Sequence, residues 1–174
     1  MNLLSKYNKV IFSNYKLNNE LFEKYKNNDL KDLKFIGRYF NRQVNLPQNL
    51  THLTFGDYFN QTVDLPQNLT HLTFGDYFNQ TVDLPENLTH LTFGYWLNQK
   101  VEMPFSIKYL KLENDNANNL DYLPEGIEEL ELGYEFNDNT LCNLPNSLKK
   151  IKLHKNYNGN LKCLPKNIEV KYYE

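Results

Sequence analysis

Residues 46–64 read LPQNLTHLTFGDYFNQTVD, and residues 65–83 repeat these letters without a change. Within each copy the segment Leu-x-Phe alternates apolar and polar residues, the pattern of a strand with one buried face. The Leu-Pro or Met-Pro step recurs along the chain every 19 to 21 residues, and all seven prolines stand in this phase. A period near 20 residues predicts a solenoid in which each repeat forms one coil.

The alternating apolar pair predicts one strand per coil. Leu53 and Phe55 stand two residues apart, so both point to the same face of a strand. The rest of each period is too short for a long helix, and proline interrupts a regular helix there. We therefore predict a mostly β, right-handed solenoid with a single parallel sheet, short turns, irregular returns and little helix. The equivalent pairs are Leu33/Phe35, Leu72/Phe74, Leu91/Phe93, Leu110/Leu112, Leu130/Leu132 and Ile151/Leu153.

An asparagine follows an apolar residue at one phase of the repeat. Its amide can bond backbone groups of its own coil and the next one, which a tight turn would otherwise leave unpaired. We expect a structural ladder of amides rather than a ligand site. The asparagines in this phase are Asn41, Asn60, Asn79, Asn98, Asn137 and Asn158.

Composition narrows the classes of partner. The chain has 174 residues, which fits one domain, and its net charge of −2 supplies no basic excess for nucleic acid or anionic membranes. No apolar run at the start is long enough for a signal peptide or a membrane helix. Cys142 and Cys163 fall about one coil apart, and we interpret them as a reduced, buried pair. These features together predict an intracellular, cytoplasmic location in a reducing compartment.

The motif LPxNLTHLTFGxxFNQ resembles the FNIP repeat, a leucine-rich-repeat-like family found chiefly in social amoebae and in large amoeba-infecting DNA viruses. The resemblance covers residues 30–163 and weakens over 103–122, where ENDNANN replaces the Phe-Asn step. It implies a leucine-rich-repeat-like solenoid and, if the protein is viral, a location in the host cytoplasm. Many family members join the repeats to an F-box that recruits ubiquitin-ligase machinery, and residues 1–29 show no convincing F-box.

The segments that flank the repeats resemble caps. Residues 10–21, VIFSNYKLNNEL, imitate LTFGDYFNQTV, so we predict that 1–29 form a degenerate capping coil. Residues 22–29, LFEKYKNN, fit one or two helical turns. Residues 164–174 end in charged positions suited to solvent and are predicted to form a C-terminal cap strand of the same continuous domain.

Residues that alternate with the buried pair must point outward and form columns across the stacked strands. The first half of this face is neutral, whereas the second half alternates in sign from coil to coil, which favours strand register. One column is His52, His71, His90, Tyr109, Glu129 and Lys150. The next is Thr54, Thr73, Thr92, Lys111, Glu131 and Lys152, and a flanking column is Thr51, Thr70, Thr89, Lys108, Glu128 and Lys149.

Three histidines in one column raise the question of a metal site, because histidine is the commonest nitrogen ligand of transition metals. Straight stacking of the strands places the rings side by side rather than around one ion. No carboxylate or thiol stands at the same phase within these three repeats to complete a site. A passive exposed column is the simpler reading of His52, His71 and His90, with a pH-dependent surface as an alternative.

Aromatic residues offer a second candidate surface. Phe40, Phe59, Phe78 and Leu97 are expected to point inward, so the residue before each would form an outer ridge. Tyrosine and tryptophan give large contact areas at low entropic cost and dominate binding hot spots. The third copy changes most, to Tyr95-Trp96-Leu97. The ridge candidates are Tyr39, Tyr58, Tyr77, Tyr95 and Trp96.

Catalytic motifs do not occur: there is no phosphate-binding glycine loop, HExxH, CxxC or nucleophile elbow. We therefore predict a non-enzymatic, monomeric scaffold without a cofactor, which presents the outward strand face and the aromatic ridge to a protein partner. The alternatives are a substrate-recognition component of a ubiquitin-ligase pathway, by family analogy alone, and metal or small-molecule binding by the histidine column. The partner-binding candidates are His52, Thr54, His71, Thr73, His90, Thr92, Tyr109, Tyr39, Tyr58, Tyr77, Tyr95 and Trp96.

Overall fold

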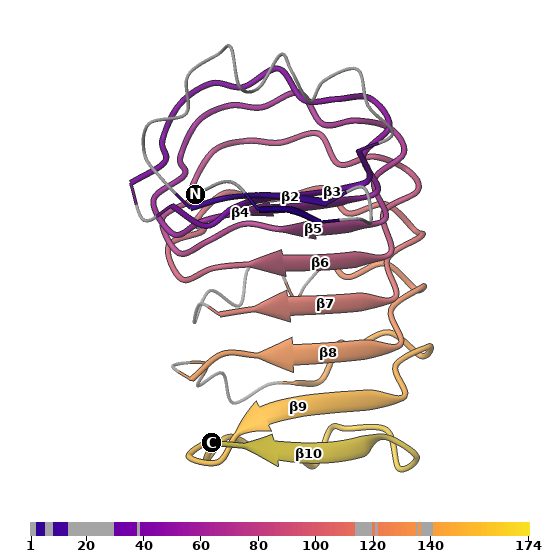
Figure 1. Ribbon diagram of the computed structural model, residues 1–174. Coiled ribbons are helices and arrows are strands. Elements are labelled where there is room, and N and C mark those ends of the chain that lie inside the picture. The colour runs from indigo at the N-terminus through magenta and orange to yellow at the C-terminus, as the bar shows by residue number, and fades with distance from the viewer. Residues whose placement is uncertain are drawn as a thin grey trace.

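The computed structural model consists of strands stacked one above the next, with their return segments on one side (Figure 1). No helix occurs among the residues that the structure describes. The segment LFEKYKNN and most of ENDNANN, for which the sequence suggested a helical turn and a degraded repeat, lie outside them. The described residues are 3–5, 9–13, 30–37, 39–113, 120, 122–134, 136 and 141–174.

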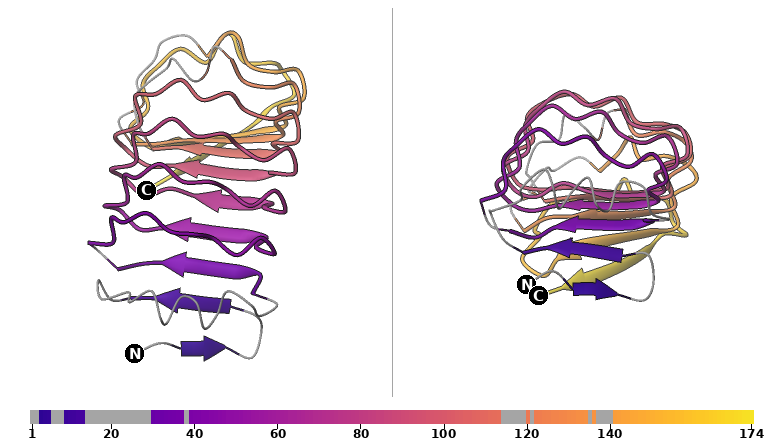
Figure 2. Two further views of the ribbon diagram at one scale, coloured as in Figure 1. Left: turned by 90° about the horizontal axis from the view of Figure 1, so that it is seen from above. Right: turned by 45° about the horizontal axis from the view of Figure 1, so that its top comes forward.

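Ten strands form one sheet in strict chain order, and β2 to β10 pair in parallel. This confirms the predicted parallel solenoid with one strand per coil. Only β1 runs antiparallel to its neighbour β2, a feature absent from the sequence pattern (Figure 2). The strands are β1 (Leu3–Ser5), β2 (Lys9–Phe12), β3 (Asp32–Phe35), β4 (His52–Phe55), β5 (His71–Thr73), β6 (His90–Phe93), β7 (Tyr109–Leu112), β8 (Glu129–Leu132), β9 (Lys150–His154) and β10 (Glu169–Tyr173).

Inward side chains form one continuous core between the sheet and the returns. Leu53 and Phe55 are each 1% exposed, and the residues at the same phase of β3 to β9 are equally buried. Phe59, which follows the strand, is also fully buried, as the sequence predicted. In each coil the buried residues contact those of the coils above and below, so a single repeat has no complete core of its own.

Two turns shape each coil. After the strand, the Phe59 N–H donates to the Gly56 carbonyl, and before the next strand the Leu50 N–H donates to the Pro47 carbonyl. Glycine is required at position 75 because a Cβ there would lie 2.5–2.6 Å from backbone atoms of Gly56 and Asp57 in the coil before. The sequence phase marks, Leu-Pro and Gly, are therefore the two corners of the coil.

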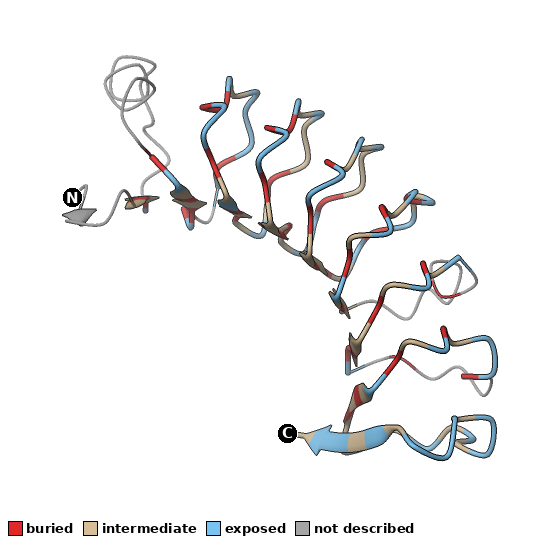
Figure 3. Ribbon diagram, turned by 90° about the vertical axis from the view of Figure 1, so that its right-hand side faces the viewer, coloured by how far each residue is buried: buried red, intermediate tan, exposed pale blue. Residues whose placement is uncertain are grey.

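The stack is curved. The strands line the inner, concave side of the arc and the return segments radiate on the outer, convex side (Figure 3). The outward residues of the strands therefore face the hollow of the arc.

Candidate interaction surface

The predicted columns exist on the concave face. Main-chain pairing places His52 beside His71 and His71 beside His90, and Thr54 beside Thr73 in the next column. Farther along, Tyr109, Glu129 and Lys150 continue the column of histidines. The register follows from the core because a slip by one residue would turn every buried side chain outward.

The imidazoles of the histidine column, His52, His71 and His90, stack face to face. Their ring centroids are 4.1 Å apart in both steps, with the planes 13° and 11° from parallel. The Tyr109 ring extends the stack at 5.7 Å from His90. Adjacent coils thus hold these rings side by side, as the sequence predicted.

A threonine fixes the tautomer of each histidine. The Thr70 hydroxyl donates to the Thr51 carbonyl at 3.1 Å and lies 2.9 Å from Nδ1 of His71. Because the hydroxyl proton is already engaged, the Thr70 oxygen acts as acceptor and Nδ1 of His71 carries the hydrogen. The other pairs, Thr51 with His52 and Thr89 with His90, repeat this geometry. In the neutral form of each imidazole, Nε2 is therefore the atom with the free lone pair.

The middle ring strongly resists protonation. Burial first, and then the charges that His52 and His90 would carry, together lower the pKa of His71 from 6.5 to about 4. His71 is therefore neutral near pH 7. No group of three or more His, Cys, Asp or Glu that could hold a metal ion occurs among the described residues.

The C-terminal half of the concave face carries ion pairs instead of stacked rings. In this charge network, Glu131 contacts Lys111 at 2.9 Å and Lys152 at 3.1 Å, and the Tyr109 hydroxyl donates to it at 3.0 Å. The network comprises Lys108, Tyr109, Lys111, Glu113, Glu128, Glu129, Glu131, Lys149, Lys150 and Lys152.

The pKa values in the charge network shift in the directions that ion pairing dictates. Burial alone would lower the pKa of Lys111, but its bonds to Glu113 and Glu131 outweigh burial and raise it. Burial likewise opposes the ionised form of Glu131, yet Lys111 and Lys152 lower its pKa. Burial and the adjacent Glu131 raise the pKa of Tyr109 to about 12. These groups keep their charges or protons near neutral pH, and their polar atoms are engaged with one another.

The aromatic ridge consists of Tyr39, Tyr58, Tyr77, Tyr95 and Trp96, next to the carboxyl ends of the strands. Tyr58 and Tyr77 stack at 4.7 Å, and Trp96 follows Tyr77 at 6.4 Å. Tyr39 is 64% exposed and Trp96 is 51% exposed, although each contacts another ring. Tyr95 packs edge-on against Trp96 at 5.0 Å. The rings of the ridge are thus in continuous contact, with Tyr39, Tyr77 and Trp96 exposed and Tyr58 and Tyr95 half-buried.

The asparagine ladder is confirmed in the central coils. The Asn41 amide oxygen accepts from the Asn60 backbone N–H at 3.0 Å, and Asn60 and Asn79 bond the next coil in the same way. Gln61 and Gln80 also donate to this ladder, which the repeat pattern did not predict. Asn137 lies outside the described residues.

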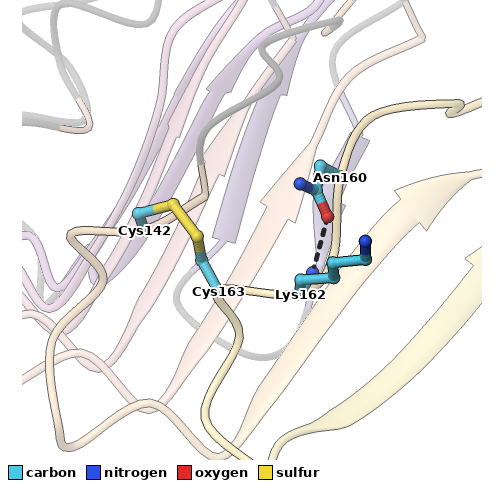
Figure 4. Close-up of a disulfide and its surroundings, with 4 residues drawn as sticks. All are labelled: Cys142, Asn160, Lys162 and Cys163. Carbon is cyan, nitrogen blue, oxygen red and sulfur yellow. Dashed lines mark hydrogen bonds between the residues drawn. A yellow bond between two sulfur atoms is a disulfide. The ribbon is translucent and has the colours of Figure 1, made fainter.

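The cysteines contradict the sequence interpretation. Cys142 and Cys163 form a disulfide, and both are exposed rather than buried (Figure 4). Their sequence separation of 21 residues is one more than the 20-residue step between the neighbouring Leu-Pro marks, so the two do not share a phase of the repeat. The prediction of a reducing compartment rested on unpaired cysteines and loses that basis.

Comparisons with known proteins agree with this architecture. The model of the FNIP Repeat matches residues 42–64, 61–95 and 78–115. Comparison with curated proteins gives no match. Among solved structures, the crystal structure of CroV588, described as "a novel circular LRR protein structure", superposes on 98% of this chain with a TM-score of 0.64 and 26% identity. The chain spans 34% of that protein.

Parallel coils, buried Leu-x-Leu-type strands and the likeness to CroV588 define a leucine-rich-repeat-like solenoid. Over residues 42–115 the chain matches the model of the FNIP Repeat, so this part of the solenoid is similar to FNIP repeats. Within the described part of the chain, no helix is long and apolar enough to cross a membrane.

Proposed function

We propose that this protein is a binding scaffold that takes a protein partner on the N-terminal half of its concave face and on the aromatic ridge. The observation that carries the proposal is the ridge, a continuous row of ring contacts in which Tyr39, Tyr77 and Trp96 are exposed and Tyr58 is half-buried. Tyrosine and tryptophan are the residues most enriched at binding hot spots.

The rigidity of the ridge supports this role. Main-chain bonds from Tyr77 to Asp57 and from Trp96 to Asp76, of 2.8 and 2.7 Å, hold the ridge turns of adjacent coils together. Rings that are already stacked lose little rotamer freedom when a partner covers them, so more of the contact energy contributes to affinity.

The two halves of the concave face differ in what they offer a partner. In the charge network each glutamate already contacts lysines, so a partner would have to displace existing pairs. In the histidine column, Nε2 of His52, His71 and His90 has no hydrogen bond to the described residues. Because these atoms are acceptors, a partner that meets them must supply N–H or O–H donors. The neighbouring hydroxyls of Thr54, Thr73 and Thr92 can donate or accept.

Binding rather than catalysis fits these features. The candidate residues present lone pairs and ring edges over a wide curved surface, and the sequence contains no catalytic motif. The hollows of the surface lie elsewhere: one of about 340 Å³ is lined by return-segment residues such as Thr62, Asp64 and Asp83.

Affinity purification from the native host with mass spectrometry, followed by direct binding of each captured protein, tests the proposal. The variant Tyr77→Ser/Trp96→Ser should weaken binding of the true partner by at least roughly tenfold. Phe105→Ser is the matched control, because Phe105 is 78% exposed but lies on a Pro-turn away from the ridge. Far-UV circular dichroism should be unchanged in both variants.

The outcomes separate the alternatives. A partner that binds the ridge variant as well as the wild type, and loses affinity with Phe105→Ser, would place the interface on the convex side and refute the proposal. Loss of affinity with His52→Gln/His71→Gln/His90→Gln as well as with the ridge variant would show that the partner extends onto the concave face.

A further inference from the structure

The last coil, residues 155–174, has almost no core of its own. None of its residues is buried, whereas every preceding coil of the sheet from β3 onward has several fully buried side chains. Pro165 is exposed, although Pro124 and Pro145 at the same phase are buried. The apolar residues of the last coil only pack against the edge of the core; they are Leu161, Leu164, Ile168 and Val170. Hydrophobic burial therefore stabilises this coil less than any central coil.

Other contacts attach the last coil to the stack. β10 pairs along its whole length with β9, and the Tyr173 hydroxyl donates to the Leu132 carbonyl at 2.6 Å. The ion pair between Lys155 and Glu174 is exposed, so it contributes little. The Tyr157 ring also stacks on Phe136 of the preceding coil at 6.2 Å. The covalent link is the disulfide from Cys142 to Cys163, which joins the return segment of the last coil to that of the coil before it.

The disulfide lies where a small thiol can reach it. Cys142 and Cys163 are both exposed on the return side of the solenoid, with Lys162 next to Cys163 (Figure 4). The Lys162 backbone N–H donates to the Asn160 side-chain oxygen at 2.9 Å. Both cysteine residues are exposed in the folded molecule.

We propose that this disulfide is a thiol-responsive clasp that governs whether the last coil stays docked on the solenoid. A thiolate attacks one cysteine sulfur, forms a mixed disulfide with it and releases the other sulfur as a thiolate. A second small thiolate then attacks the small-molecule sulfur of the mixed disulfide and releases the cysteine sulfur as a thiolate, so the protein gains two thiols and the reductant leaves as its own disulfide. The two electrons come from the small thiols, and no other reagent is needed.

Opening the clasp changes the end of the sheet. When the last coil detaches, the N–H and C=O groups of β9 that pair with β10 lose their partners, and the side chains of Ile151 and Leu153, now 0% and 1% exposed, lose their cover. An unpaired parallel edge beside exposed apolar residues is a surface that another strand can join. The clasp therefore controls the exposure of a docking edge as well as the stability of one coil.

Hydrogen–deuterium exchange with mass spectrometry on the full chain tests this. Exchange is measured without reductant and with dithiothreitol, and peptides covering β10 are compared with peptides covering β5. Because the disulfide closes a loop of 21 residues, its loss should raise the opening of the last coil, and hence the exchange of β10 amides, by roughly 100-fold. The β5 peptides should not respond.

Two variants control for the chemistry of the reductant. Cys142→Ser should exchange in β10 like the reduced wild type, and Cys142→Ser/Cys163→Ser should not respond to dithiothreitol. Equal β10 exchange in oxidised and reduced protein would overturn the proposal, as would titration of two free thiols in the unreduced protein. A parallel rise in β5 would also overturn it, because the disulfide would then stabilise the whole domain rather than the last coil.

Discussion

The coils of β4 to β6 and those of β7 to β9 share one backbone but carry different chemistry. In the first group the core is aromatic, with Phe55 and Phe59 stacked at 3.8 Å, and the concave face shows neutral stacked histidines. In the second group leucine fills the strand positions, and the concave face is a mesh of lysine and glutamate. Main-chain pairing and an apolar phase are therefore sufficient for the fold, which leaves the outward positions free to vary.

The difference has a consequence for function. Ion pairs across adjacent strands satisfy the polar groups of the C-terminal half within the molecule, whereas the histidine column keeps three acceptor atoms without an internal donor. The acceptor atoms of the concave face that a partner could bond thus lie on the N-terminal half, on the same coils as the aromatic ridge.

The largest effect is expected in the aromatic core. Phe74→Ala removes a fully buried ring that lies 3.7 Å from Phe78, and it should lower the free energy of unfolding by about 3–5 kcal/mol. Phe74→Leu should recover much of this loss, because leucine occupies the same phase at Leu112 and Leu132. Urea unfolding measures both. If Phe74→Leu is as unstable as Phe74→Ala, the two cores are not interchangeable.

The second effect separates the two kinds of concave face. Glu131→Ala leaves Lys111 and Lys152 without their shared acceptor and should lower the free energy of unfolding by about 2 kcal/mol. Thr73→Ala, at the same phase in the neutral half, should change stability by less than about 0.5 kcal/mol. Thermal unfolding at low and high salt measures both, and only the Glu131 effect should shrink with salt. Equal effects at the two sites would contradict the distinction.

A smaller effect is expected when the threonine that orients a histidine is removed. Thr70→Val deletes the acceptor of the His71 Nδ1–H and should cost about 1 kcal/mol. The sharper readout is nitrogen-15 NMR of the imidazole, which should show His71 as the Nδ1–H tautomer in the wild type and as a mixture in the variant. A wild-type spectrum dominated by the Nε2–H tautomer would refute the assignment.

A further effect is a pH dependence specific to the N-terminal half. The unfolded chain protonates His71 at its ordinary pKa of 6.5, but the folded chain does so only at about 4. The unfolded state therefore binds more protons in this interval, and stability falls as the pH decreases from 6.5 to 4.

The measurement must separate the titration of His71 from that of the groups around it, and a His71 variant does so. Its stack partners are His52 and His90, and Asp32 and Tyr109 stand at the two ends of the column. Lys34 and Lys111 flank the adjacent threonine column. The carboxylates of Glu129 and Glu131, with lowered pKa values, lose their contribution only below 4.5. Urea unfolding between pH 7 and 5 should thus show a decline in the wild type that His71→Gln reduces; an identical decline in the variant would rule out His71 as its source.

Much of the fold and part of the candidate surface could be predicted because they depend on local periodicity. The Leu53/Phe55 alternation determines which face of each strand is buried, and the constant period places equivalent residues side by side. The histidine column, the alternating charges and the tyrosine ridge follow directly from that stacking. Their roles in binding stay predictions, since the position of a residue does not identify its partner.

The remaining features depend on contacts between residues that do not share a phase. The Thr70 hydroxyl contacts both the Thr51 carbonyl and the His71 imidazole. These contacts depend on side-chain positions in two coils, so the tautomer could not be predicted from the sequence. Gln61 joins the ladder by reaching the amide of the preceding coil, a bond that no sequence pattern signals.

By itself the sequence determined the period, the strands, the buried face and the order of side chains on the concave face, since each follows from one repeating local conformation. Only the tertiary structure decided the curvature, the antiparallel β1 and the disulfide between Cys142 and Cys163. Those features arise from how neighbouring coils pack and turn against one another. Two cysteines one residue out of phase meet only because the return segments of adjacent coils are offset in space.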